Sequence, residues 1–163
     1  WYSLKNLLYH LYYKGEFMEF LIKHFNDLNT NELYEIVKSR FEVFVMEQKI
    51  VDEQDFDDKD KLCYHGFFKD NGRIIAYGRI VLKGLSYDEC SIGRVLVLKN
   101  YRKQGLAKKL LENLIKYIEE ELKEEHITIS AQEYVKELYK SVGFKEFGDV
   151  YYEVNIPHIK MKI

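Results

Sequence analysis

Hydrophobic residues recur at helical spacing over residues 30–47, and this pattern predicts the first helix of the chain. Asn29 or Thr30 can cap the helix, and Glu32 is placed to close a capping box from Asn29. Arg40 falls on the apolar stripe, so we expect it to have an acidic partner, because an unpaired buried charge is very costly. The stripe consists of Leu33, Ile36, Val37, Phe41 and Phe44.

Alternating or continuous apolar runs predict seven strands, and two further amphipathic segments predict helices. Asn71-Gly72, between the second and third strands, indicates a tight hairpin turn. Gly143 is placed to end the last helix in the left-handed conformation. The strands are residues 19–23, 63–69, 73–82, 90–98 and 127–131, with two more within 144–163, and the helices are residues 105–122 and 134–142. This order predicts an α/β (α+β) domain in which helices cover a mixed sheet.

Composition limits the class of protein. A chain of 163 residues is long enough for one core and too short for two ordinary domains. The net charge of −2 argues against a nucleic-acid binder with a basic face, and no apolar run approaches the roughly 20 residues that cross a bilayer. Cys63 and Cys90 are the only cysteines, and neither has the spacing of a metal site. We therefore expect a cytoplasmic domain without metal, membrane or nucleic-acid partners.

Residues 1–17 differ from the rest and are treated apart from a single domain at 18–163. Lys14-Gly15-Glu16 can be encoded by a ribosome-binding sequence shortly before Met18, so one hypothesis is that Met18 is the native start and residues 1–17 are translated leader. The alternative is a real N-terminal helix that packs its Leu and Tyr side chains on the domain.

The segment from Val95 to Ala107 passes from a buried strand through a polar loop directly into a helix. Free N–H groups at a helix start form an anion site, and Gly105 has no side chain that would block the approach of a phosphate. Lys99 to Lys109 contains five Lys or Arg residues and no acid. The spacing is neither that of the nucleotide triphosphate loop nor that of the dinucleotide fingerprint, and the local positive charge suits a ligand that carries several phosphates.

Several short motifs resemble those of one family, and they occur in the right order. Arg102-x-x-Gly105-x-Ala107 is similar to the acetyl-CoA signature of the GCN5-related N-acetyltransferases (GNAT). Leu138-Tyr139-x-x-x-Gly143-Phe144 resembles the late helix and turn of that family. The other motifs resemble the ElaA-like branch, and they are Arg40-x-x-Val-Phe-Val-x-Glu47-Gln48, Ile92-Gly-Arg-Val95, Ala131-Gln132 and Ile156-Pro-His158.

The resemblance implies a mostly antiparallel seven-stranded sheet in which two parallel strands splay around the pantetheine arm of the cofactor. The implied activity is N-acetyl transfer from acetyl-CoA to a primary amine of a small molecule or peptide. Leu96 and Val97 would supply backbone hydrogen bonds, one of them to the thioester oxygen. The implied cofactor-binding residues are Val95, Leu96, Val97, Arg102, Lys103, Gln104, Gly105, Leu106, Ala107, Lys108, Gln132 and Tyr139.

Direct attack of an amine on a thioester needs a base for the amine and an acid for the departing thiolate. Tyr139 matches the family position that can protonate the thiolate. Glu47 is the first candidate for the base, because partial burial at the end of the first helix would raise its pKa. His65 and then His158 follow as candidates, although many members of this fold use only a water chain.

The acceptor side is less defined by the sequence. Arg94 binds a substrate carboxylate or pairs with Glu47 or an Asp from 55–60, and Gln48 and His158 complete the expected substrate-binding set. The acidic residues 52–60 form either a solvated loop or an amine-binding mouth. A non-catalytic acyl-CoA sensor is the alternative function. The C-terminal strand offers a surface for a homodimer.

Overall fold

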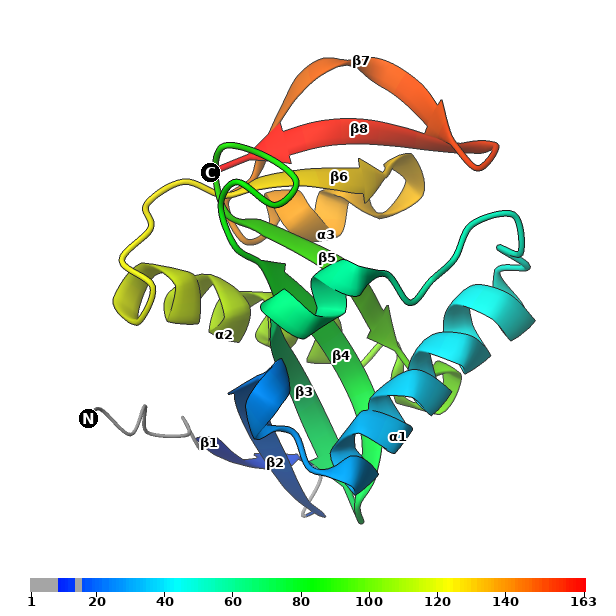
Figure 1. The fold of residues 1–163 in the computed structure, drawn as a ribbon, viewed down its shortest axis with the longest axis vertical. Helices are drawn as coiled ribbons and strands as arrows, with labels where there is room; N and C mark the ends of the chain where they lie inside the picture. The colour runs from blue at the N-terminus through cyan, green and yellow to red at the C-terminus, as the bar shows by residue number, and fades with distance from the viewer. Residues whose placement is uncertain (1–8, 14–15) are drawn as a thin grey trace.

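The computed structural model describes residues 9–13 and 16–163, which form two antiparallel sheets and three α-helices (Figure 1). The larger sheet has the order β1-β2-β3-β4-β5 and the smaller one β6-β8-β7. The strands of the larger sheet are Tyr9–Tyr13, Glu16–His24, Tyr64–Asp70, Arg73–Val81 and Ser91–Val97, and β6, β7 and β8 are Thr128–Gln132, Lys145–Glu153 and Ile156–Lys162. This confirms the expected class and all seven expected strands, which are divided between two sheets.

The strand β1 lies in the segment for which a leader or a helix was considered. It pairs antiparallel with β2, from Tyr9 opposite Phe20 to Tyr13 opposite Glu16. The helix alternative is therefore wrong for residues 9–13, where aromatic residues favour a strand. Residues 1–8 and 14–15 lie outside the described part, and the leader hypothesis stays a prediction.

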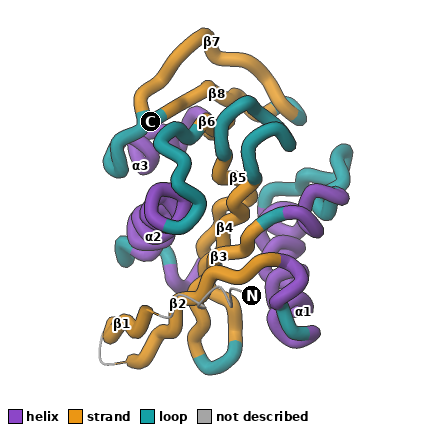
Figure 2. The backbone as a smooth tube through the Cα atoms, turned by 60° about the vertical axis from the view of Figure 1, so that its left-hand side comes forward, coloured by secondary structure: helices purple, strands orange, loops and turns teal. Residues whose placement is uncertain are grey.

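Helices α1 (Thr30–Arg40) and α2 (Leu106–Glu120) lie on opposite sides of the larger sheet, and both contact β4 (Figure 2). The short α3 (Lys136–Lys140) packs against α2 and β6. Leu114 of α2 comes so close to the sheet that a Cβ added at Gly66 or Gly78 would lie within 2.3 or 2.6 Å of its methyl groups. The glycines therefore set the distance between α2 and the sheet.

The predicted capping box of α1 is confirmed. The Asn29 side chain accepts from the Glu32 N–H at 2.9 Å, and Glu32 accepts from the Asn29 N–H at 3.1 Å. The helix continues as a π-helical segment, Phe41–Glu47, so its expected end near residue 47 is also confirmed. π-helical turns of this kind occur often at functional sites.

The buried face of this helix is displaced from the predicted stripe. Ile36 is buried, whereas Leu33 and Val37 lie on the flank with more than a third of their surface exposed. The inner positions include Ser39, whose hydroxyl donates to the Ile74 carbonyl of β4 at 2.8 Å, and Arg40. Polar side chains occupy the inner face because each has a partner there, and hydrophobicity alone does not reveal such partners.

The two sheets meet at one parallel bridge, between Cys90 and Ile127. The Thr128 N–H donates to the Cys90 carbonyl at 2.9 Å, and beyond this point β5 stays with β4 while β6 pairs with β8. A bulge in β5 follows, where Arg94 has a φ of 55° and the register against β4 shifts. The expected splaying of two parallel strands is present, and it opens a cleft between the sheets.

Candidate functional site

The cleft between β5 and β6 has a volume of about 510 Å³. Its walls come from the π-helical segment, β5, the start of α2, β6, α3 and the hairpin of β7 and β8. Most residues expected at the site line it, namely Glu47, Gln48, Arg94, Val95, Leu96, Val97, Arg102, Ala107, Gln132, Tyr139 and His158. The structure thus brings together side chains that lie up to 111 positions apart in the chain (Glu47 to His158).

The loop before α2 presents a row of free backbone donors. From Lys103 to Lys108, no backbone N–H group has a hydrogen-bond partner among the described residues, and the first bond of the helix runs from Lys109 to the Gly105 carbonyl. Lys103 and Gly105 have φ angles of 59° and 77°, so the chain turns twice through the left-handed region. A helix start with such turns forms a concave site for an anion. The backbone N–H groups of residues 103–108 are the donors that would bind a pyrophosphate.

Other side chains of this loop point elsewhere. Leu106 is buried in the core, and the Gln104 amide donates to the Asn100 carbonyl at 3.2 Å. Lys108 makes a long surface ion pair with Glu112, at 3.9 Å. Of this loop, Lys103, Gln104, Gly105, Leu106 and Lys108 do not line the cleft.

Arg102 joins the end of β5 to the π-helical segment. Its Nε donates to the Val97 carbonyl at 2.8 Å, and its two Nη atoms donate to the Glu47 carboxylate at 2.5 and 2.8 Å. This hydrogen bonding, together with the charge of Arg102, holds the pKa of Glu47 below its usual value. The expectation that burial would raise the pKa of Glu47 is therefore wrong, because its side chain is 41% exposed and paired.

We expect Glu47→Gln to tighten CoA binding about two- to fivefold, because it frees Arg102 from a partner that competes with phosphate. An exposed ion pair contributes up to about 1 kcal/mol, which corresponds to that range. Calorimetry with CoA measures the change. Glu120→Gln, which removes a surface carboxylate at the C-terminal end of α2, serves as the control. Unchanged or weaker binding in Glu47→Gln would show that Glu47 and the ligand do not compete for Arg102.

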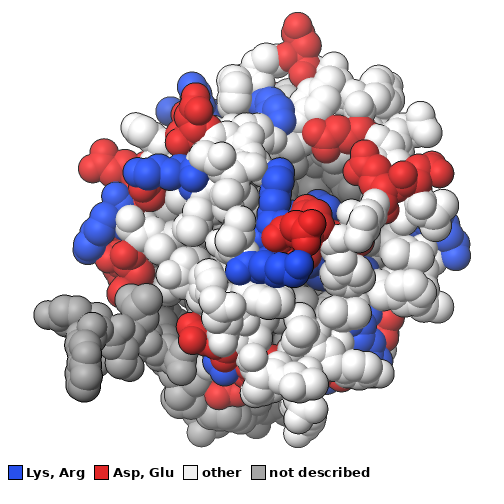
Figure 3. Space-filling view, in the orientation of Figure 1, with Lys and Arg blue, Asp and Glu red and all other residues white. Residues whose placement is uncertain are grey.

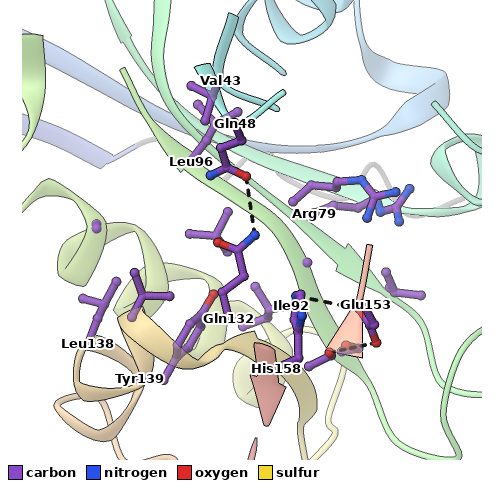
Figure 4. A pocket seen from close by; sticks show the side chains of 18 of the residues that line it. Val43, Gln48, Arg79, Ile92, Leu96, Gln132, Leu138, Tyr139, Glu153 and His158 are labelled. Carbon is purple, nitrogen blue, oxygen red and sulfur yellow. Dashed lines mark hydrogen bonds and ion pairs between the residues drawn. The ribbon is translucent and has the colours of Figure 1, made fainter. Parts of the chain in front are cut away.

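Tyr139 lies on α3 and reaches the cleft from below in Figure 4, with its hydroxyl directed toward Gln132. The side chain is buried against Phe144, and its hydroxyl has no hydrogen-bond partner in the part of the chain that the structure describes. Burial raises the pKa of Tyr139, so the phenol keeps its proton at neutral pH. A protonated, unbonded phenol is suited to donate to an anion in the cleft.

His65 lies outside the cleft, so the structure does not support it as a base. Its ring lies between β3 and the loop before it, where Nδ1 is 2.8 Å from the Tyr77 hydroxyl and Nε2 is 2.9 Å from the Asp60 carbonyl. Burial lowers the pKa of His65 to about 4. Both nitrogens are engaged on the side of the sheet that faces α1, which identifies His65 as part of the core.

Acidic residues 52–60 were expected to form a solvated loop or an amine-binding mouth, but Asp55, Asp57 and Asp60 within this segment pair with buried arginines. Arg40 bonds to Asp55 at 2.9 Å and to Asp60 at 2.8 Å, and Arg79 bonds to Asp57 and Asp60 at 2.6 and 2.7 Å. The expected acidic partner of Arg40 is thus confirmed. These arginines come from α1 and β4, and they fix the loop against the larger sheet.

Arg94 also pairs with the acidic loop. Its Nε lies 2.8 Å from an Asp55 oxygen and its Nη2 3.7 Å from Asp57, so of the expected alternatives it pairs with aspartates of the loop. Gln48 and Gln132 approach each other across the cleft, with the Gln132 amide 3.4 Å from the Gln48 oxygen (Figure 4). This contact links the π-helical segment to the smaller sheet.

Glu153 and Ser130 also line the cleft, and no pattern in the sequence singles them out. The Ser130 hydroxyl donates to Glu153 at 3.1 Å, and Glu153 lies 3.8 Å from Nε2 of His158. Glu153 comes from the end of β7, next to a two-residue turn of Val154 and Asn155 that both have positive φ. Its position depends on the pairing of β7 with β8, which connects it to His158 in space.

Acidic and basic side chains are mixed over the face shown in Figure 3, without a large area of one sign. Within residues 9–13 and 16–163, no cluster of three or more potential metal ligands is found. No helix of the described part is long and apolar enough to cross a membrane. The strand β8 is the middle strand of its sheet, so both of its edges are already paired, and a dimer through the C-terminal strand would need other surfaces.

Comparisons with protein families, sequences and solved structures all match this chain to acyltransferases or to ElaA-like proteins. The family profile of the acetyltransferase (GNAT) domain matches residues 25–163. A UPF0039 protein of Schizosaccharomyces pombe is 37% identical over 148 residues, covering 90% of this chain and 97% of the relative. An acyl-CoA N-acyltransferase from Pseudomonas aeruginosa has a TM-score of 0.82 at 33% identity, and ElaA from Escherichia coli 0.83 at 28%. Each structure covers 89% of this chain and 98% of its own.

Proposed function

The chain belongs to the GNAT family of acetyltransferases, and from this premise we propose that it transfers the acetyl group of acetyl-CoA to a primary amine of a small molecule or peptide. The observation that carries the proposal is the row of free N–H groups from Lys103 to Lys108 at the mouth of the cleft. These donors, with Arg102 beside them, match the charge and shape of a pyrophosphate.

The cleft provides positions for the rest of the cofactor. The β5 edge at Leu96 and Val97 faces the opening between the sheets, so its backbone groups would bond to the pantetheine arm and to the thioester oxygen. Tyr139 would give its proton to the CoA thiolate when the carbon–sulfur bond breaks. His65 lies outside the cleft and is not suited to act as the base, and the lowered pKa of Glu47 makes Glu47 a weak base.

The proposal is tested by calorimetry with CoA and by release of free thiol from acetyl-CoA in the presence of primary amines. Heat of binding together with amine-dependent thiol release is the expected result. Binding without thiol release would favour the acyl-CoA sensor, and the absence of both would remove the cofactor assignment.

Gly105→Ala is expected to weaken CoA binding by at least about tenfold. At a φ of 77° an alanine costs about 1–2 kcal/mol, and its methyl group would enter the open space above the loop, where no protein atom lies within 4 Å. The matched control is Gly72→Ala, at a φ of 81° in the β3–β4 turn and also in open space. Both variants carry the same backbone strain, so equal CoA affinity in the two would contradict a phosphate site at Gly105.

A further inference from the structure

Two side chains of the smaller sheet, Glu153 and His158, lie together in the cleft. We propose that Glu153 binds the ammonium group of the acceptor and that His158 removes a proton from it, so that the protein acts on cationic primary amines with a short apolar chain. This inference rests on the proposed acyl transfer and adds the class of the acceptor and the identity of the base.

The charges in the cleft leave one carboxylate available. Three carboxylates line it, Glu47, Asp57 and Glu153. Glu47 is paired with Arg102 and Asp57 with Arg79. Within the described residues, Glu153 has no Lys or Arg partner, and its contacts are the Ser130 hydroxyl and the His158 ring. A carboxylate held this way beside a cleft is a site for a positive charge.

The hydrogen bonding of His158 fixes which nitrogen can act. Its Nδ1 lies 2.8 Å from the Ile156 carbonyl, and a carbonyl oxygen only accepts, so Nδ1 carries the hydrogen. In the neutral ring Nε2 therefore presents a lone pair. That atom faces Glu153 in the cleft (Figure 4), and only 8% of the surface of His158 is exposed. The ring is thus held in the form that accepts a proton.

A recess lined by both polar and apolar side chains adjoins this pair and suggests the rest of the acceptor. It has a volume of about 110 Å³, and its apolar lining consists of Phe44, Ile50, Val154 and Ile156. Glu53 also lines the recess and is exposed. The volume fits a short alkyl or cyclic group and not a large one. The recess thus supplies contacts for the carbon chain of an amine whose nitrogen lies between Glu153 and His158.

The reaction balances with these groups. The acceptor ammonium gives one proton to Nε2 of His158, and the free amine forms a carbon–nitrogen bond to the thioester carbon. The carbon–sulfur bond then breaks, and the sulfur takes the proton of the Tyr139 hydroxyl. The nitrogen loses a second proton to solvent, and solvent returns a proton to Tyr139. The third hydrogen stays on the amide nitrogen, and His158 releases its proton to water.

Aromatic and charged groups face His158 from several elements. Glu153 and Tyr151 face it from β7, with the Tyr151 ring centroid 6.1 Å away. Glu53, Asp55 and Arg94 also line the recess, and Asp55 is paired with both Arg94 and Arg40. Glu153 is the charged group in contact with Nε2, so it would stabilise the imidazolium formed when the amine is deprotonated.

The kinetic test compares cyclohexylamine, which is an ammonium at neutral pH, with aniline, which is neutral and has the same number of heavy atoms. Glu153→Gln is expected to raise KM about tenfold for cyclohexylamine and little for aniline, in line with the loss of a charged hydrogen bond. His158→Gln is expected to lower kcat/KM for cyclohexylamine about 10- to 100-fold at neutral pH. This deficit should shrink at higher pH, where more of the amine is free.

Glu125→Gln and His126→Gln, two exposed positions before β6, are the controls. Equal changes of KM for both amines in Glu153→Gln would overturn the role of Glu153. A deficit in His158→Gln that is independent of pH would show that His158 only supports the structure.

Nitrogen NMR of the His158 ring provides a readout without turnover. The Nδ1–H tautomer is expected, and cyclohexylamine should shift the ring signals in the presence of CoA, less so in Glu153→Gln. An Nε2–H tautomer would overturn the proposal. If no amine releases thiol but the ring signals respond to cyclohexylamine, the proposed acyl transfer is wrong and the amine site is supported. If Glu153→Gln and His158→Gln turn over cyclohexylamine as fast as the wild type does, acyl transfer is supported and the amine site is wrong.

Discussion

Replacing Tyr139 with phenylalanine is expected to lower kcat by about 10²–10³-fold, because the thiolate then leaves without a positioned acid. The hydroxyl has no hydrogen-bond partner among the described residues, so its removal leaves no buried group unsatisfied and should change stability little. Initial rates of thiol release at saturating acetyl-CoA measure kcat, and calorimetry should give an unchanged affinity for CoA.

Tyr117→Phe is the matched control for this experiment. Tyr117 is also a buried tyrosine on a helix, but it packs against Tyr64 and does not line the cleft. It should therefore keep its activity. A Tyr139→Phe variant as active as Tyr117→Phe would mean that water protonates the thiolate.

Arg40→Met is expected to lower the free energy of unfolding by about 3–5 kcal/mol. The arginine has 1% of its surface exposed and bonds to Asp55 and Asp60, so its loss leaves two carboxylates near the core without that partner. Arg79 still contacts Asp60, which keeps the loss at the lower end of the range. Urea unfolding followed by circular dichroism measures the change.

Arg73→Met, at the start of β4, offers a comparison with an arginine that is less buried. Arg73 also bonds to two carboxylates, Glu35 and Glu42, but 23% of its side chain is exposed. Exposed pairs contribute at most about 1 kcal/mol, so this variant should stay close to wild type. Equal losses in the two variants would show that the burial of the Arg40 cluster is not what makes it stabilising.

The sequence predicts features that depend on neighbouring residues. The seven strands and the helices follow from local periodicity, and the start of α2 follows from Gly105 between a buried strand and a helix. The Asn71-Gly72 turn is confirmed by φ angles of 47° and 81°, and Gly143 by its φ of 105°. These features need no information about distant parts of the chain.

Features that depend on distant partners were predicted poorly. Glu47 meets Arg102 across 55 positions of sequence, and that contact reverses the expected direction of its pKa shift. The inner face of α1 is set by Ser39 and Arg40, whose partners lie 35 and 15–20 positions away. Glu153 is positioned by a strand pairing that no local pattern reveals. Polar contacts of this kind are settled only when the chain is folded.

The parting of β5 and β6 after their single bridge has a mechanical consequence. Two facing rows of main-chain donors and acceptors can be satisfied by a guest that carries amides of its own, and the pantetheine arm has two. On the proposed function, the cofactor would then occupy the place of a missing strand and join both halves of the molecule. Ligand that binds only the native state adds stability in proportion to the logarithm of its concentration. The supply of CoA would thereby determine how rigid this protein is, as well as how fast it works.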